Sequence, residues 1–76
     1  MKTFKLSEPY IELNRLLKVL NIAESGGQAN QIIDEGAVLV NGNKELRRRN
    51  KLRPGDKISV GKMTIVIEAD TTAPES

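Results

Sequence analysis

The chain has 76 residues, a net charge of +2, and neither cysteine nor histidine. This length suits one domain near the lower limit at which a hydrophobic core holds a fold without disulfides or metal. The composition excludes thiol nucleophiles, the usual zinc ligands and the commonest general base, so we expect no enzyme, no metal and no cofactor. No apolar run reaches the length of a signal peptide or a membrane helix, and we expect a cytoplasmic protein.

The first half of the chain predicts one strand and two helices. Apolar side chains alternate with Lys5 across residues 3–6, as in a half-buried strand. After Pro9, leucines recur at helical spacing and predict a helix with one apolar face. Residues 25–28 (Ser-Gly-Gly-Gln) fit a capping box that starts a second helix, which ends near Gly36. The predicted core residues of the two helices are Leu13, Leu16, Leu17, Leu20, Ala29, Ile32 and Ile33.

After the second helix, the apolar period changes to that of strands. Residues 37–40 predict a strand, and Asn41-Gly42 predicts a type I′ hairpin turn because both residues tolerate positive φ. The return strand is expected from Asn43 to about Arg47. Pro54-Gly55 predicts another turn, and a closing hairpin is expected to follow it.

These elements predict one α+β domain over residues 1–68, followed by a disordered tail at residues 69–76. The apolar alternation from Ile58 to Ile67 around Gly61-Lys62 gives the closing hairpin. We therefore expect two short helices packed on one face of a small antiparallel sheet of four to five strands.

A basic segment lies from Lys44 to Lys57. Seven of its fourteen residues are Lys or Arg and two are acidic, so it carries +5 while the rest of the chain carries −3. Concentrated positive charge is typical of a polyanion site, and the planar forks of arginine match phosphate. The alternative is a solvated edge that keeps a sheet from pairing with its neighbours. The candidate phosphate contacts are Lys44, Arg47, Arg48, Arg49 and Lys51.

The turn Ser25-Gly26-Gly27-Gln28 is a second candidate. Capping a helix would explain Ser25 and Gln28, but it leaves the glycines unexplained, since Gly in a helix costs about 1 kcal/mol relative to Ala. Bare amides at a helix N-terminus accept phosphate oxygens, so both interpretations stay open.

Two cations of the first helix, Arg15 and Lys18, form a third candidate. They either face solvent, with Arg15 close enough to pair with Glu12, or join the basic segment if it lies beside them. With Phe4 and Tyr10 as the sole aromatic residues, the chain lacks the stacking platform of single-strand binders. Contacts to phosphate, sugar and shape are therefore expected.

Four segments have a spacing typical of one family. They are Ser25-Gly-Gly-Gln-Ala29, Ile32-Ile33-Asp-Glu-Gly36, Val38-Leu-Val-Asn-Gly42 and Pro54-Gly-Asp56. With these segments, the chain resembles the S-four-type RNA-binding domain, also called the αL motif, over about residues 8–68. It is most similar to small stand-alone bacterial proteins of this type.

The resemblance implies binding to structured RNA, such as ribosomal or transfer RNA. The sequence does not determine the oligomeric state, and a monomer is the favoured form. The positions that the resemblance implies are Ser25, Gly26, Gly27, Gln28, Asn30, Lys44, Arg47, Arg48 and Arg49. Larger relatives commonly have Arg in place of Gly26 and Asn30, and an Arg-Leu-Asp start where this chain has Glu12-Leu13-Asn14. These departures move the expected contact toward residues 44–51.

Two other classes of function remain as alternatives. One is a protein-interaction adaptor with a basic surface, although the final Ala-Pro-Glu-Ser lacks the Gly-Gly tail of a carrier. The other is an enzyme that uses carboxylates such as Glu8, Glu12, Asp34 and Glu35, for which the sequence predicts no pocket.

Overall fold

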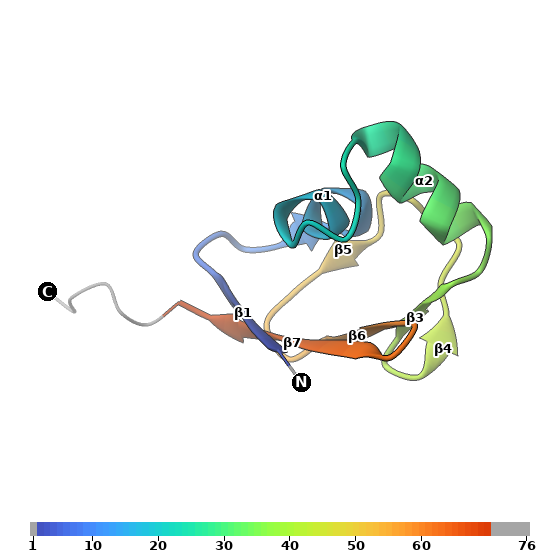
Figure 1. Cartoon of the computed structure of the whole chain (residues 1–76). Helices are drawn as coiled ribbons and strands as arrows, with labels where there is room; N and C mark the ends of the chain where they lie inside the picture. The colour runs from blue at the N-terminus through green and yellow to red at the C-terminus, as the bar shows by residue number, and fades with distance from the viewer. Residues whose placement is uncertain (1, 71–76) are drawn as a thin grey trace, which may run out of the picture.

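The computed structural model describes residues 2–70, which form a layer of two helices over one face of a five-stranded sheet (Figure 1). The sheet has the order β1-β7-β6-β3-β4, and β2 and β5 form a separate two-stranded ribbon on the helical side. The strands are β1 (Lys2–Leu6), β2 (Ile11–Glu12), β3 (Val38–Val40), β4 (Asn43–Lys44), β5 (Lys51–Leu52), β6 (Lys57–Val60) and β7 (Met63–Ala69). The helices are α1 (Leu13–Val19) and α2 (Gly26–Asp34).

The sheet is mixed, which corrects the expectation of a purely antiparallel one. Both predicted hairpins, β3–β4 and β6–β7, are antiparallel, and Asn41 and Gly42 have φ of 53° and 87° as a type I′ turn requires. In contrast, β1 runs parallel to β7, with Phe4 opposite Ile67. No tight turn joins these two strands, because the whole helical layer lies between them in the chain, and a long connection permits parallel pairing.

The second helix begins and ends as predicted. The Ser25 side chain accepts a hydrogen bond of 3.1 Å from the Gln28 amide, which caps α2. The Gln28 side chain reaches one residue beyond the capping-box partner and accepts from the Glu24 amide at 2.6 Å. Gly36 has φ of +76°, the left-handed conformation that ends a helix.

The first helix begins at Leu13, later than predicted, because Ile11 and Glu12 form β2 and pair with β5. Leu13, Leu16 and Leu17 are buried as predicted, whereas Leu20 is partly buried at the edge of the core. Neither helix within residues 2–70 has the length and apolar character needed to cross a bilayer.

The core lies between the helices and the sheet. From α2, Ala29 and Ile33 are buried as predicted, and Ile32 packs at the margin. The remaining buried residues come from every strand except β4 and from the loop between the helices; they are Leu6, Ile11, Ala23, Val38, Leu52, Ile58, Ile65 and Ile67. Apolar side chains from both layers therefore hold the helices at a fixed position on the sheet.

The predicted disordered tail begins too early. Ala69 belongs to β7 and pairs with Leu6, and the Asp70 amide donates a hydrogen bond of 2.8 Å to the Leu6 carbonyl. The structured domain thus passes residue 68. The rest of the predicted tail, residues 71–76, lies outside the described residues.

Candidate nucleic-acid interface

The three consecutive arginines lie in a loop, which we call the basic loop (residues 45–50). The predicted return strand was too long: β4 ends at Lys44, and the last bond to β3 runs from the Glu45 amide to the Val38 carbonyl at 3.0 Å. The chain must then leave the sheet, because β5 pairs with β2 on the helical side. The alternation of side chains expected for a strand therefore does not apply to the arginines.

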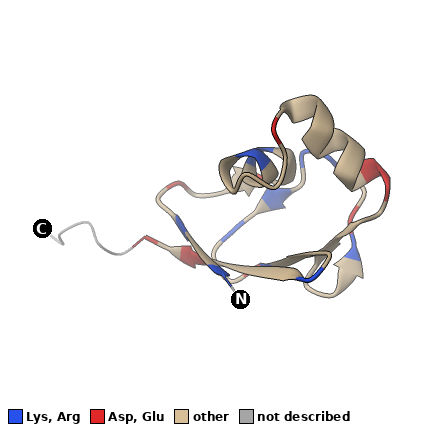
Figure 2. Cartoon of the chain, viewed as in Figure 1, with Lys and Arg blue, Asp and Glu red and all other residues tan. Residues whose placement is uncertain are grey.

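The basic loop caps the first helix with its own backbone. Glu12, the residue that precedes α1, makes no side-chain cap. Instead, the amides of Leu13 and Asn14 donate to the carbonyls of Asn50 and Arg48, at 2.9 and 3.0 Å. Free amides at a helix start need acceptors, and the loop supplies two. The loop is thereby fixed against α1, and Figure 2 shows its basic positions in blue beside the two helices.

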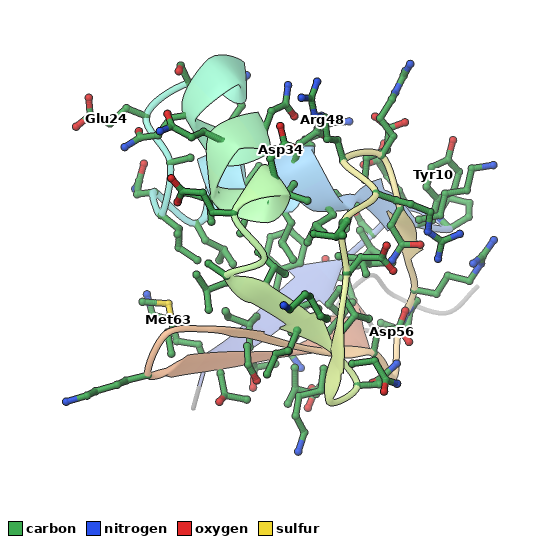
Figure 3. All side chains as sticks on the ribbon, turned by 90° about the vertical axis from the view of Figure 1, so that its right-hand side faces the viewer. Tyr10, Glu24, Asp34, Arg48, Asp56 and Met63 are labelled. Atoms are coloured by element: carbon green, nitrogen blue, oxygen red, sulfur yellow. The ribbon has the colours of Figure 1, made fainter. Side chains whose placement is uncertain are left out.

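Each of the three arginines pairs with an acidic side chain. Arg47 makes two side-chain hydrogen bonds to Glu45, at 3.0 and 3.2 Å. Arg48 makes a bidentate contact to Asp34 at the end of α2, with 3.0 Å from Nε to Oδ1, and Figure 3 shows these two side chains meeting. Arg49 contacts Glu12 of β2 at 3.2 Å. The acids Asp34 and Glu12 therefore orient the loop toward α2 and β2.

These ion pairs are open to solvent. The side chains of Arg47, Arg48 and Arg49 are 76%, 53% and 79% exposed. Hydrogen bonds from Arg48 lower the pKa of Asp34, and hydrogen bonds from Arg47 lower that of Glu45, so both carboxylates are charged at neutral pH. Exposed pairs contribute little to stability because water and salt screen them. The Asp34 side chain is 46% exposed, so a phosphate can replace it on Arg48 at small cost. Glu45 is held more firmly, because its side chain is 15% exposed and also accepts from the Arg47 backbone amide.

Two further candidates are Lys44 of β4 and Asn30 of α2. The aliphatic end and Nζ of Lys44 cover Gly36, where an added Cβ would come within 3.2 Å of the lysine side chain. Asn30 lies between the helices, and its Oδ1 accepts a hydrogen bond of 3.3 Å from the Asn14 side chain. The backbone amide of Asn14 also donates to the Arg48 carbonyl of the basic loop. Asn14 therefore links Asn30 to the loop.

The turn at the other end of α2 is separate from the arginines. Arg48 contacts Asp34, eight residues after Gly26, which is about 12 Å along the helix. Ser25 and Gln28 are both engaged in capping. Gly26 and Gly27 do not have positive φ, and an added Cβ would meet nothing closer than 3.9 Å. No contact within residues 2–70 thus requires glycine at these two positions.

Both cations of the first helix are exposed, as one of the two alternatives predicted, but the partner of Arg15 differs from the expected one. Arg15 lies 4.0 Å from Glu8, and Glu12 pairs with Arg49 instead of with Arg15. Lys18 lies in the last turn of α1, where a positive charge complements the helix dipole. Among the described residues, no three His, Cys, Asp or Glu side chains are close enough to hold a metal ion.

The ribbon of β2 and β5 was not predicted. It places two residues that were not among the predicted contacts, Tyr10 and Arg53, next to Lys51. Tyr10 precedes β2, and its ring lies 4.9 Å from Lys51 Nζ, measured to the ring centroid. Arg53 follows β5 and lines a hollow with Lys51. The alternation of charged and apolar residues in Lys51-Leu52-Arg53 was the sequence signal for a half-buried strand.

Comparisons with known proteins give matches for the family and the fold. The family model described as S4 domain matches residues 4–68. YbcJ of Escherichia coli (strain K12) is 40% identical over 70 residues, which cover 91% of this chain and all of YbcJ, and YbcJ of Shigella flexneri matches equally. The solution structure of E. coli YbcJ has a TM-score of 0.70 over 91% of this chain and 89% of that one. That structure is described as revealing an αL motif involved in RNA binding.

Proposed function

Because this chain belongs to the S4-domain family, we propose that it is a non-catalytic module that binds structured RNA, such as ribosomal or transfer RNA, through phosphate and shape. One observation carries the proposal. The basic loop is anchored by backbone hydrogen bonds to α1, while its guanidinium groups stay exposed. A rigid backbone with exposed cations lowers the entropy cost of meeting a rigid polyanion. The RNA-binding description of the YbcJ structure supports the same conclusion.

In this proposal, the phosphates of one RNA strand follow the basic loop. Arg48 and Arg49 exchange their carboxylate partners for phosphate oxygens, and Lys44 adds a charge beside them. The open amides of Gly26 and Gly27 receive a second phosphate at the start of α2. The full set of proposed contacts is Arg15, Lys18, Ser25, Gly26, Gly27, Gln28, Asn30, Lys44, Arg47, Arg48, Arg49 and Lys51.

The salt dependence of RNA binding tests the proposal. If about four to six phosphates are neutralised, the logarithm of the affinity for a hairpin RNA falls with the logarithm of the salt concentration, with a slope of about −3 to −5. Filter binding at several salt concentrations measures the slope. An affinity that does not change with salt would contradict the proposal, as would binding of an acidic protein partner in place of RNA.

We also propose that the protein binds RNA as a monomer, in the cytoplasm and without a metal ion. A single short loop presents the charge, and one copy suffices for a contact with a few phosphates. Sedimentation of the complex is expected to give one protein per hairpin, and addition of a chelator is expected to leave the affinity unchanged. A complex with two copies of the chain would contradict the monomer.

A further inference from the structure

The ribbon of β2 and β5 presents a second surface, distinct from the contact between Arg48 and α2. Ile11 and Leu52 are opposite each other and buried in the core. Because side chains alternate along a strand, the residues on either side of them point outward. Tyr10, Lys51 and Arg53 therefore share the outer face of the ribbon.

This outer face contains a basic hollow of about 340 Å³. Its lining residues are Arg47, Arg49, Asn50, Lys51 and Arg53. Four of the five are cations and none is acidic. Within residues 2–70, the side chains of Lys51 and Arg53 form no ion pair with a carboxylate. The hollow thus keeps an excess of positive charge even when Arg47 and Arg49 hold their acidic partners.

Tyr10 lines a second hollow of different character and contacts the basic hollow through Lys51. Tyr10 is 39% exposed as a residue, and its ring lies over Nζ of Lys51. The second hollow, about 240 Å³, is lined by Glu8, Pro9, Tyr10, Ile11, Glu12 and Arg15. Its lining contains two carboxylates and one cation: Glu8 lies 4.0 Å from Arg15, and Oε2 of Glu12 accepts a hydrogen bond from Arg49 outside the hollow. The carboxylate oxygens that these arginines do not engage can accept hydrogen bonds from amino groups. An aromatic wall with acceptors beside it suits a nucleobase.

We propose that this face binds an unpaired nucleotide of the RNA. A backbone phosphate lies in the basic hollow, and the base stacks on Tyr10 in the second hollow, which we call the acidic hollow because Glu8 and Glu12 line it. The inference rests on the proposed RNA-binding function and adds Tyr10 and Arg53 to its contacts. It also states a preference: a base with an exocyclic amino group, such as cytosine or adenine, is favoured over uracil, because Glu8 and Glu12 offer acceptors. The preferred ligand is thus an RNA helix with an adjoining single strand.

The chain provides a specific optical probe, since it has one tyrosine and no tryptophan. The experiment compares a blunt hairpin RNA with the same hairpin carrying a short single-stranded tail of cytidines or of uridines. Affinity is measured by filter binding, and stacking by quenching of the tyrosine emission. The cytidine tail is expected to raise the affinity at least about fivefold and to quench the emission, and the uridine tail to do less.

Variants of Tyr10 locate the effect. Tyr10→Leu is expected to lose the gain from the tail and to keep the affinity for the blunt hairpin, whereas Tyr10→Phe keeps the gain. Arg53→Gln is expected to weaken binding of the tailed RNA several-fold. Lys62→Gln is the matched control, because Lys62 lies next to Met63, which Figure 3 places on the opposite side of the molecule from Tyr10. Thermal unfolding confirms that each variant folds.

The outcomes separate this inference from the proposed function. Tight binding to the blunt hairpin with no gain from either tail overturns the inference and leaves the RNA-binding function intact. Failure to bind any of the three RNAs overturns both. Equal affinity for the two tails overturns the assignment of the acidic hollow to the base. Quenching by free cytidine monophosphate at the concentrations at which the tailed RNA acts would make the site a nucleotide site and overturn the RNA assignment.

Discussion

The basic loop and the start of α2 were both expected to bind phosphate, and the structure builds them in different ways. The loop carries its charge on exposed side chains and is held by two backbone bonds to α1. The turn from Ser25 to Gln28 carries no charge of its own and uses its polar side chains to cap the helix. In the proposed interface, the loop therefore supplies charged contacts, whereas the turn supplies uncharged amides with room for a close approach.

Charge reversal in the loop is expected to have the largest effect. Changing Arg47, Arg48 and Arg49 together to Glu should lower RNA affinity at least about 100-fold, because three charge-assisted contacts are lost. The thermal midpoint should change by only a few degrees, since all three side chains are exposed. Filter binding and thermal unfolding measure the two quantities.

A second triple variant controls for net charge. Lys2, Lys5 and Lys62 lie on β1 and in the β6–β7 turn and are also exposed, so changing them to Glu reverses the same number of charges elsewhere. A loss of affinity as large as that of the arginine variant would mean that net charge alone drives binding. If the arginine variant unfolds, the milder triple change to Gln tests the same loop without new repulsion from Asp34.

An intermediate effect is expected at the start of α2. Changing Gly26 and Gly27 to Ala should stabilise the protein by about 0.4–1 kcal/mol per site, because alanine lowers the entropy of the unfolded chain and both sites have room for a Cβ. The same change should weaken RNA binding several-fold, because methyl groups keep a phosphate from the amides. Increased stability with unchanged affinity would remove this turn from the interface.

A small effect of opposite sign is expected at Asp34. Asp34→Asn removes the carboxylate that competes with phosphate for Arg48, so RNA affinity at low salt should rise about two- to threefold. Glu35→Gln is the matched control, because Glu35 is also exposed and is adjacent in sequence but does not contact Arg48. Weaker binding in Asp34→Asn would show that the carboxylate holds Arg48 in its binding position.

The smallest effect concerns the pH dependence of stability. Arg48 lowers the pKa of Asp34 below its ordinary value of 3.8. The pair therefore stabilises the fold fully above that value, and the contribution disappears as the pH falls through the lowered pKa. Thermal unfolding of the wild type should lose slightly more stability than Asp34→Asn as the pH is lowered from neutral through the carboxylate range. Parallel curves would mean that the exposed pair does not contribute.

The sequence was sufficient to predict elements whose signals are local. The cap at Ser25, the end of α2 at Gly36 and the hairpin turn at Asn41 each depend on neighbouring residues, and the structure has them where they were predicted. The leucine spacing likewise identified the buried face of α1. The family resemblance is confirmed by the match over residues 4–68.

Features that depend on distant partners were missed. Because Ile11 pairs with Leu52, α1 begins later than expected. No local sequence signal near Pro9 predicts this pairing. Parallel pairing of β1 with β7 and the contact of Arg48 with Asp34 also join segments that are far apart in the sequence. The ion-pair partners of Arg48 and Arg49 also lie far away in the sequence. The sequence therefore identified the cations of the candidate site but not the acidic residues that they contact.

The central claim is that the basic loop is the main RNA contact. Mapping the RNA-binding surface of the protein by NMR tests this claim most directly. Adding a hairpin RNA to the isotope-labelled protein should shift the amide signals of residues 45–53, with smaller shifts at Gly26 and Gly27 and minimal shifts in β6 and β7. The basic loop would then be the main contact, as the account requires. Shifts concentrated on the sheet, with the signals of Arg47, Arg48 and Arg49 unchanged, would contradict it.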